Sequence, residues 1–112
     1  PRYHPQGVNQ YSPSEMTRRA WWLALSLLWN RRRFGDLDIL ITHSPPLGIH
    51  DEDTQAHRGL HAINWLIEWA KPRYHLHGHI HFQRRNLTPS VTQLGATTII
   101  NVFPYQVIEI KK

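Results

Sequence analysis

The sequence has no cysteine, no long apolar run and no starting methionine, and each absence narrows what the chain can be. Without cysteine there is no disulfide framework, no thiolate zinc site and no cysteine nucleophile. The longest apolar stretch, 20–29, is interrupted by Ser26 and is far shorter than the ~20 residues that a membrane span needs. The first residues, 1–5, lack the apolar segment of a secretion signal. We therefore expect a cytoplasmic protein with no membrane partner, whose N-terminus has been cut.

The length limits the number of domains, and the charge limits the kinds of partner. The chain has 112 residues, which is one domain at most, and 13 basic against 8 acidic side chains give a net charge of +5. Five of the basic residues, Arg18, Arg19 and 31–33, fall in one predicted helix. A nucleic-acid-binding face is one interpretation of these arginines, and a solvated helix end is the other, which we favour.

The pattern of apolar residues and breakers predicts an α/β fold. A helix is expected over 13–33, because Ser12 can cap it, Glu15 completes a capping box and Gly35 follows its end. A buried strand over 37–42, a helix over about 55–70 and a strand over 73–77 come next. An antiparallel meander is then predicted from short β segments at 82–87, 91–94, 97–102 and 105–110. The tryptophans have helical spacing and are predicted to pack in the core: Trp21, Trp22, Trp29, Trp65 and Trp69.

Four histidines occupy alternate positions late in the chain: His75, His77, His79 and His81. Side chains two residues apart share a face in a strand, so two such imidazoles can reach one metal ion or two neighbouring ions. Gly78 lies among them and permits a turn of the backbone, which predicts a strand end that presents ligands. A metallo-β-lactamase would continue with x-Asp-His, and the residues that follow here exclude that pattern.

His43 is the second element of the candidate site. It closes the predicted strand 37–42 and precedes Ser44-Pro45-Pro46. In open α/β sheets, catalytic and binding groups gather at the carboxyl ends of strands, where both His43 and the pair His79 and His81 are expected. Metal ligation and ordinary polar strand ends both remain open as interpretations of these residues.

The two motifs Thr42-His43-Ser44-Pro45-Pro46 and Gly78-His79-Ile80-His81 resemble the second half of the calcineurin-like metallophosphoesterases. The likeness is greatest to a small bacterial and animal branch that reads THxPP-x-G and later HxxGHxH. Gly48, Asp51 and Gly59, together with the opening Tyr3, Gly7 and 10–11, are also similar to that branch. The resemblance covers nearly the whole chain, with both motifs in the expected order.

The resemblance implies a fold and also an incomplete site. The family fold is a four-layer αββα sandwich, so this chain is expected to form half of it, a mixed sheet with helices on one face. The family holds two metals with five motifs, and the three earlier ones, which include Asp-x-His and Gly-Asn-His, do not occur here. Residues 1–112 therefore resemble the C-terminal part of one such domain, and its N-terminal half becomes an implied partner. Alone, this half would expose one apolar sheet face.

Carried over by resemblance, His43 and His79 would bind one divalent metal and His81 the other. The implied cofactors are two ions among Mn, Fe, Ni and Zn, which imidazole suits, and the implied substrate is a phosphomonoester or phosphodiester. His75 and His77 are expected to orient the ligands rather than to bind metal. The leaving-group histidine and the bridging carboxylate would lie before residue 1, so this chain alone is expected to be inactive.

Other polar residues receive a plainer interpretation. His57 and His61, four residues apart on the predicted helix, are expected on its surface, and His50 lies in the preceding loop. Residues 51–53 form a solvated acidic loop or border the site. Two other functions stay open: a non-catalytic histidine-rich metal-binding module and, less favoured, a basic nucleic-acid-binding domain.

Overall fold

The fold is a four-stranded sheet with two helices against it, seen in a computed structural model that describes residues 10–81 and 89–110. The elements follow in the order α1 (Pro13–Phe34), β1 (Ile39–Thr42), α2 (His61–Ala70), β2 (Tyr74–His77), β3 (Val91–Leu94) and β4 (Thr97–Asn101). The sheet order is β1-β2-β4-β3, with β1, β2 and β4 parallel and β3 antiparallel to β4. The predicted α/β class with a mixed sheet is confirmed.

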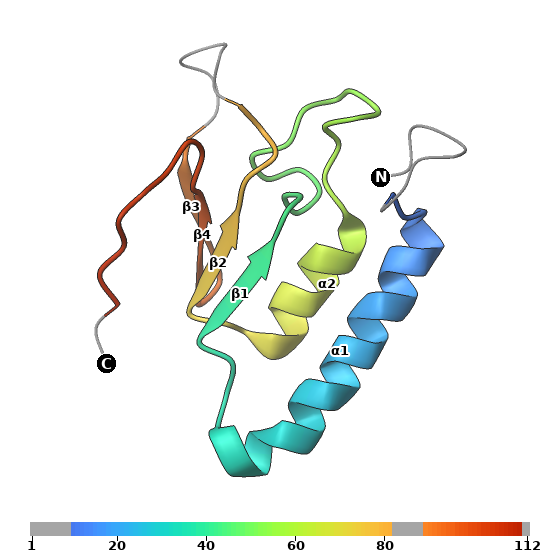
Figure 1. The fold of residues 1–112 in the computed structure, drawn as a ribbon, viewed down its shortest axis with the longest axis vertical. Coiled ribbons are helices and arrows are strands. Elements are labelled where there is room, and N and C mark those ends of the chain that lie inside the picture. The colour runs from blue at the N-terminus through green and yellow to red at the C-terminus, as the bar shows by residue number, and fades with distance from the viewer. Residues whose placement is uncertain (1–9, 82–88, 111–112) are drawn as a thin grey trace.

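The two helices pack on the same face of the sheet (Figure 1). Ala24 of α1, Leu40 of β1, Ile67 of α2 and Ile99 of β4 belong to one buried cluster. Leu40 and Ile99 stand in the same register row across the sheet, on either side of His75. The apolar core therefore lies between the helices and the sheet.

The first helix starts where its local capping residues predict, but the start of the second helix was predicted wrongly. Ser12 caps α1 with the expected capping box through Glu15. The second helix begins at His61 rather than near residue 55, because the chain before it folds back on the end of β1. The Leu60 amide donates to the Pro45 carbonyl, and a Cβ at Gly59 would collide with the Pro46 carbonyl. Residues 55–60 are therefore loop, held by backbone contacts far apart in sequence.

The C-terminal part differs from the predicted antiparallel meander. Strands β3 and β4 form an antiparallel hairpin, but β4 pairs in parallel with β2. The predicted strand over 105–110 is wrong, because no described strand lies beside that segment to share its backbone hydrogen bonds, and Tyr105 and Val107 are 81% and 95% exposed. The predicted strand over 82–87 lies outside the described residues.

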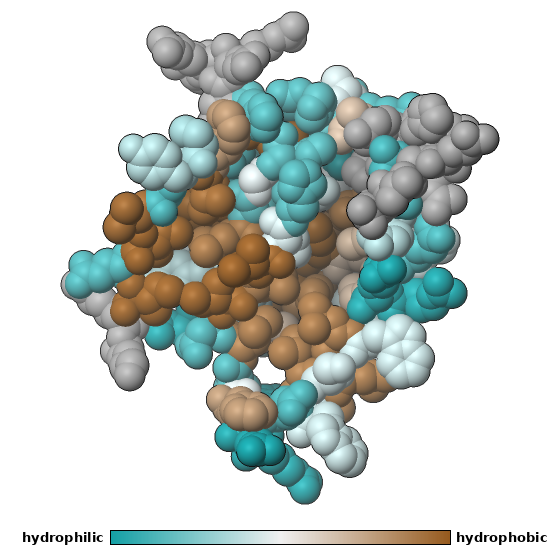
Figure 2. Space-filling view, in the orientation of Figure 1, coloured by the Kyte–Doolittle hydropathy of each residue, from teal (hydrophilic) through white to brown (hydrophobic). Residues whose placement is uncertain are grey.

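The sheet face opposite the helices carries an apolar row. Ile41, Leu76, Ile100 and Val91 stand in register across the four strands. Ile41 is 73% exposed while its neighbour Leu40, on the helical face, is 5% exposed. Figure 2 shows apolar side chains gathered over the strands and the C-terminal segment. An apolar sheet face is stable in water only when another layer covers it.

The prediction that the tryptophans are core residues is wrong for most of them. Trp22 and Trp29 on α1 are 67% and 87% exposed, and Trp21 and Trp69 are also exposed. The side of α1 that faces the core carries Ala20 and Ala24 instead. Small residues allow α1 to approach α2 closely, and the large aromatic rings are turned outward.

None of the helices in the described ranges is long and apolar enough to cross a membrane.

Candidate functional site

The predicted site residues lie at one edge of the sheet, where the parallel strands end (Figure 1). His43 follows β1 directly, and the segment 78–81 follows β2. The Gly78 amide donates to the His43 carbonyl at 3.2 Å, which joins the two strand ends. The expectation that His43 and His79 share one edge of the sheet is confirmed.

Two imidazole nitrogens face each other between the ends of β1 and β2. His79 Nδ1 and His43 Nε2 are 2.9 Å apart. His79 Nε2 donates to the Ala56 carbonyl at 2.8 Å, so the Nδ1 of a neutral His79 ring carries the lone pair. His43 Nε2–H can donate to that lone pair. When His43 instead carries its proton on Nδ1, both facing nitrogens offer lone pairs to the same point.

This 2.9 Å spacing is that of a hydrogen bond, and it is close to that of two ligands of one metal ion. Two nitrogens at about 2.05 Å from one tetrahedral ion lie about 3.3 Å apart, so the two rings would separate by a few tenths of an ångström on metal binding. A ligating histidine usually donates its other ring N–H to a backbone carbonyl or carboxylate, as His79 does to Ala56. Partial burial, followed by the charges of His79 and His81, lowers the pKa of His43 and so keeps its ring neutral, the state that metal binding requires.

The local backbone aims these rings outward. His79 has φ of 67°, a left-handed conformation that costs a non-glycine residue energy. The next residue, Ile80, is 3% exposed, and its carbonyl accepts a hydrogen bond from the buried Asn101 amide at 3.0 Å. Because Ile80 is anchored inside, the histidines on either side of it are left at the surface edge.

His81 lies near enough to lower the pKa of His43, but its ring packs against another residue. Its exposed ring stacks on Phe103, with 4.0 Å between the ring centroids. Among the residues that the structure describes, no group of three or more histidines, aspartates or glutamates is arranged to hold a metal ion. The structure thus brings two of the three predicted ligands together, and it shows no carboxylate between them.

His75 and His77 turn away from this edge into the helical side of the sheet. They are 0% and 1% exposed, in the same register rows as Leu40 and Thr42 of β1. The strand β2 ends at His77 and the backbone turns there, so His75 and His77 do not share a face with His79. These two residues line the core behind the site.

A chain of hydrogen bonds connects His77 to the site backbone. His77 Nδ1 donates to the Gly78 carbonyl at 3.0 Å, so its Nε2 accepts from His50 Nδ1 at 2.9 Å. His50 Nε2 in turn accepts from the Thr92 hydroxyl at 2.8 Å. Every ring in this chain is neutral. Burial, and then the neighbouring His77, lowers the pKa of His50 to about 4, and burial also lowers the pKa of His77.

His75 has a hydrogen bond on only one side of its ring. Thr42 donates its hydroxyl proton to the Ser44 carbonyl at 2.6 Å, so it accepts from His75 Nε2 at 2.8 Å. His75 Nδ1 is then a lone pair, and it is buried without a partner in the described structure. Burial, with smaller contributions from His77 and His50, lowers the pKa of this ring to about 3.

Two histidines near the site were not predicted to belong there. His50 completes the buried chain described above. His57 lies in the loop before α2, with its ring 5.3 Å from that of His79 and its Nδ1 2.9 Å from the Thr54 hydroxyl. Gly59 was the available signal, since a glycine inside a predicted helix indicates a break, after which His57 and His61 no longer share a helix face.

The acidic residues 51–53 stabilise the loop that contains them. Asp51 accepts the Gly59 amide at 2.9 Å, and Asp53 pairs with Arg58 at 2.6 Å in solvent. Glu52 lies 3.7 Å from His57. These contacts hold the loop that supplies the Ala56 carbonyl to His79, so the loop borders the site and also supports one of its rings.

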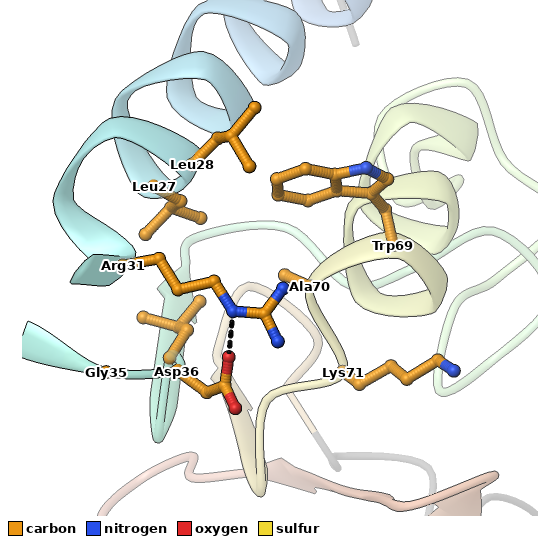
Figure 3. Close-up of a pocket in the computed structure, with 9 residues that line it drawn as sticks. Leu27, Leu28, Arg31, Gly35, Asp36, Trp69, Ala70 and Lys71 are labelled. Carbon is orange, nitrogen blue, oxygen red and sulfur yellow. Dashed lines mark ion pairs between the residues drawn. The ribbon is translucent and has the colours of Figure 1, made fainter.

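A hollow of about 430 Å³ lies at the other end of the strands, away from the histidines (Figure 3). It is bordered by Leu28 and Arg31 of α1, by Asp36, and by Trp69 and Lys71 at the end of α2. It contains no histidine, and Arg31 pairs with Asp36 across it at 2.6 Å. It is separate from the candidate metal site.

Comparison with known proteins gives relatives whose names describe no activity. No family model and no solved structure matches the chain. The chain is 38% identical over 66 residues, 59% of its length, to UPF0046 protein K07C11.7 of Caenorhabditis elegans, and 35% identical over 71 residues, 58% of its length, to UPF0046 protein C25E10.12 of the same organism. These alignments cover 21% and 24% of the relatives, so the chain matches about a quarter or less of their length.

Proposed function

We propose that this chain is the C-terminal half of a metallophosphoesterase domain and that it supplies histidine ligands to a binuclear metal centre. His43 Nε2 and His79 Nδ1 would hold one ion, and His81 the other. The reaction is hydrolysis of a phosphomonoester or phosphodiester. The observation that carries the proposal is the 2.9 Å approach of these two nitrogens, each on a different strand end.

The donor set suits the implied metals. Neutral imidazole nitrogens bind Mn, Fe, Ni and Zn, and the carbonyl of Ala56 fixes the ring of His79 in the tautomer that ligation needs. Two bound divalent ions would supply Lewis-acid activation of water and neutralise charge on the phosphate. Within this chain, His43 and His79 would bind the ion. His57 lies beside them, with its Nδ1 engaged by the Thr54 hydroxyl.

The remainder of the site belongs to the proposed N-terminal half. A bridging carboxylate is needed between two ions, and the described residues place none there. The apolar row on the outer sheet face is exposed at its ends, Ile41 and Val91, and this gives such a half a surface to cover, which supports a four-layer αββα arrangement. The chain by itself should then be unable to hydrolyse phosphoesters.

The experiment compares His79→Ala with His61→Ala in a protein that contains both halves. His61 is exposed at the start of α2 and is a matched control, because it too is a histidine. With Mn²⁺ added, turnover of p-nitrophenyl phosphate and of its bis ester should fall by at least about a thousandfold in His79→Ala, since one ion loses a ligand. His61→Ala should stay near the wild-type rate.

Metal content measured on the same samples separates the alternatives. Loss of about one metal equivalent together with the rate supports a catalytic centre. Metal binding that depends on His79 in a protein with no turnover of either ester would indicate the non-catalytic metal-binding module instead. Full activity in His79→Ala would refute the assignment of the site.

A further inference from the structure

The outer side of α1 carries a stripe of basic and aromatic residues that the proposed phosphoesterase does not use. We define the outer stripe as Arg18, Trp22, Leu25, Trp29 and Arg32. Its members follow at alternating steps of four and three residues, which keeps them on one side of a helix. The opposite side of α1 is buried through Ala20 and Ala24. In Figure 1 the helix forms the border of the molecule farthest from β3 and β4.

The centre of the outer stripe is apolar and open to solvent. Trp22 and Trp29 are 67% and 87% exposed, and Leu25 is 48% exposed. Beside it, Trp21 stacks on Trp65 of α2 with 5.8 Å between ring centroids. Three large side chains in a row, supported by a second aromatic layer, form more than the scattered apolar contacts that an ordinary surface shows.

Both ends of the outer stripe are positively charged. Helix α1 carries five arginines and one acidic residue, Glu15. Arg31 is paired with Asp36, but among the described residues neither Arg18 nor Arg32 has an ion-pair partner. A surface that covers the apolar centre must therefore also present negative charge on both sides of it.

This charge pattern disfavours a second copy of the chain as the partner. Two α1 helices paired antiparallel around Leu25 would place Arg18 against Arg32 at each end. A parallel pair would place each arginine against its own copy. Both arrangements bring like charges together at the rim of an apolar contact, which is unfavourable.

We propose that α1 binds an anionic phospholipid surface through the outer stripe. Trp22, Leu25 and Trp29 would enter the interfacial region of the bilayer, where tryptophan is favoured, while the two terminal arginines meet headgroup phosphates. From Arg18 to Arg32 the helix spans about 21 Å at 1.5 Å per residue. A single convex helix matches a flat lipid surface along that length. The expectation of no membrane partner rested on the lack of a spanning segment, and this mode of binding needs none, because the helix would lie on the membrane surface.

The proposal is independent of the phosphoesterase activity, and its test uses no substrate. Wild-type protein is floated with phosphatidylcholine vesicles and with vesicles that also contain phosphatidylserine. Binding to the anionic vesicles is expected, with a blue shift of tryptophan fluorescence and quenching by brominated lipid. Trp22→Ser with Trp29→Ser should weaken binding by at least about tenfold, and Arg18→Glu with Arg32→Glu should do the same.

Tyr105→Ser is the matched control, because this aromatic residue is 81% exposed in the C-terminal segment and distant from α1. It should leave vesicle binding unchanged. Several results would overturn the proposal: equal binding of wild type and both double variants, no quenching of the wild-type fluorescence, or equal affinity for neutral and anionic vesicles. A dimer that dissociates in Trp22→Ser with Trp29→Ser, without any vesicle binding, would assign the outer stripe to a second copy. DNA binding without vesicle binding would assign it to nucleic acid.

Discussion

The histidines before Gly78 and those after it belong to one alternating motif, yet they have opposite environments. His75 and His77 lie in β2 and are buried against the helices, while His79 faces His43 at the surface edge. The backbone makes the difference, because the strand ends at His77 and His79 adopts a positive φ. The same side chain is held neutral and inert on one side of the turn and is available for ligation on the other.

The buried histidines and the surface pair also differ in their hydrogen-bond partners. The buried rings satisfy each other and two threonine hydroxyls, and they leave one nitrogen, His75 Nδ1, unpaired. The surface pair has a fixed proton on one side of His79, and on the other side its Nδ1 faces His43 Nε2, which becomes a second lone pair when His43 carries its proton on Nδ1. Histidine spacing alone therefore indicates where a site lies, and the partners of each ring indicate which histidines serve it.

The largest effect on the buried group should come from acid. The pKa of His50 is about 4 and that of His75 about 3, both below the ordinary 6.5, so the unfolded chain takes up protons that the folded one refuses. Stability is complete above pH 6.5 and falls as the pH drops through 6.5 towards 4. Each of these two rings should lower the free energy of unfolding by up to about 3 kcal/mol over that pH range. Denaturant melts between pH 4 and 8 measure this.

His75→Leu tests the acid effect at one residue. The variant removes a buried unpaired nitrogen, and Thr42 keeps its bond to the Ser44 carbonyl. We expect equal or greater stability at pH 8 and a loss of about half of the acid dependence. His61→Ala, at an exposed position, is the control. An unchanged slope with pH in His75→Leu would contradict the assignment of this ring.

A smaller effect should link the buried group to the surface pair. Thr92→Val removes the hydroxyl that His50 accepts from, and the chain through His77 then holds the Gly78 carbonyl less firmly. Metal affinity of the complete protein should fall about tenfold, as for other residues that support ligands. Thr98→Val is a matched control, because its hydroxyl donates only to Gln93 on the exposed side. Equal metal affinities in both variants would show that the buried histidines do not affect metal binding by His43 and His79.

The smallest effect should come from His57. Its ring borders His79, but its Nδ1 is engaged by Thr54, and its contact with Glu52 is partly exposed. Exposed pairs of this kind contribute at most about 1 kcal/mol, so His57→Ala should change kcat/KM less than about fivefold. A loss as large as that of His79→Ala would place His57 in the metal site together with His43 and His79.

Local signals predicted the parts of the fold that depend on neighbouring residues. The caps of α1, the two parallel strands and the meeting of His43 with His79 all followed from short patterns. The loop that carries His50 and His57 did not, because its path depends on Gly59 packing against Pro46 and on Leu60 bonding to Pro45. Those contacts join residues that no periodic pattern connects.

The outward tryptophans show a second limit. Helical spacing identifies an apolar stripe, but it cannot say whether the stripe faces the core, and on α1 the alanines do. The segment 105–110 has a strand-like pattern and no neighbouring strand in the described residues, so the pattern alone was insufficient. In both places the deciding factor is which surface is present to cover the apolar side chains.

The most direct test of the central claim is histidine side-chain ¹⁵N NMR of the complete protein, before and after addition of Zn²⁺. Before addition, His77 should carry its proton on Nδ1 and His79 on Nε2. With Zn²⁺, the signals of His79 Nδ1 and His43 Nε2 should move to the metal-bound range, while those of His50, His75 and His77 keep their tautomers. Zn²⁺-induced shifts in the buried histidines, with none at His79, would contradict the account.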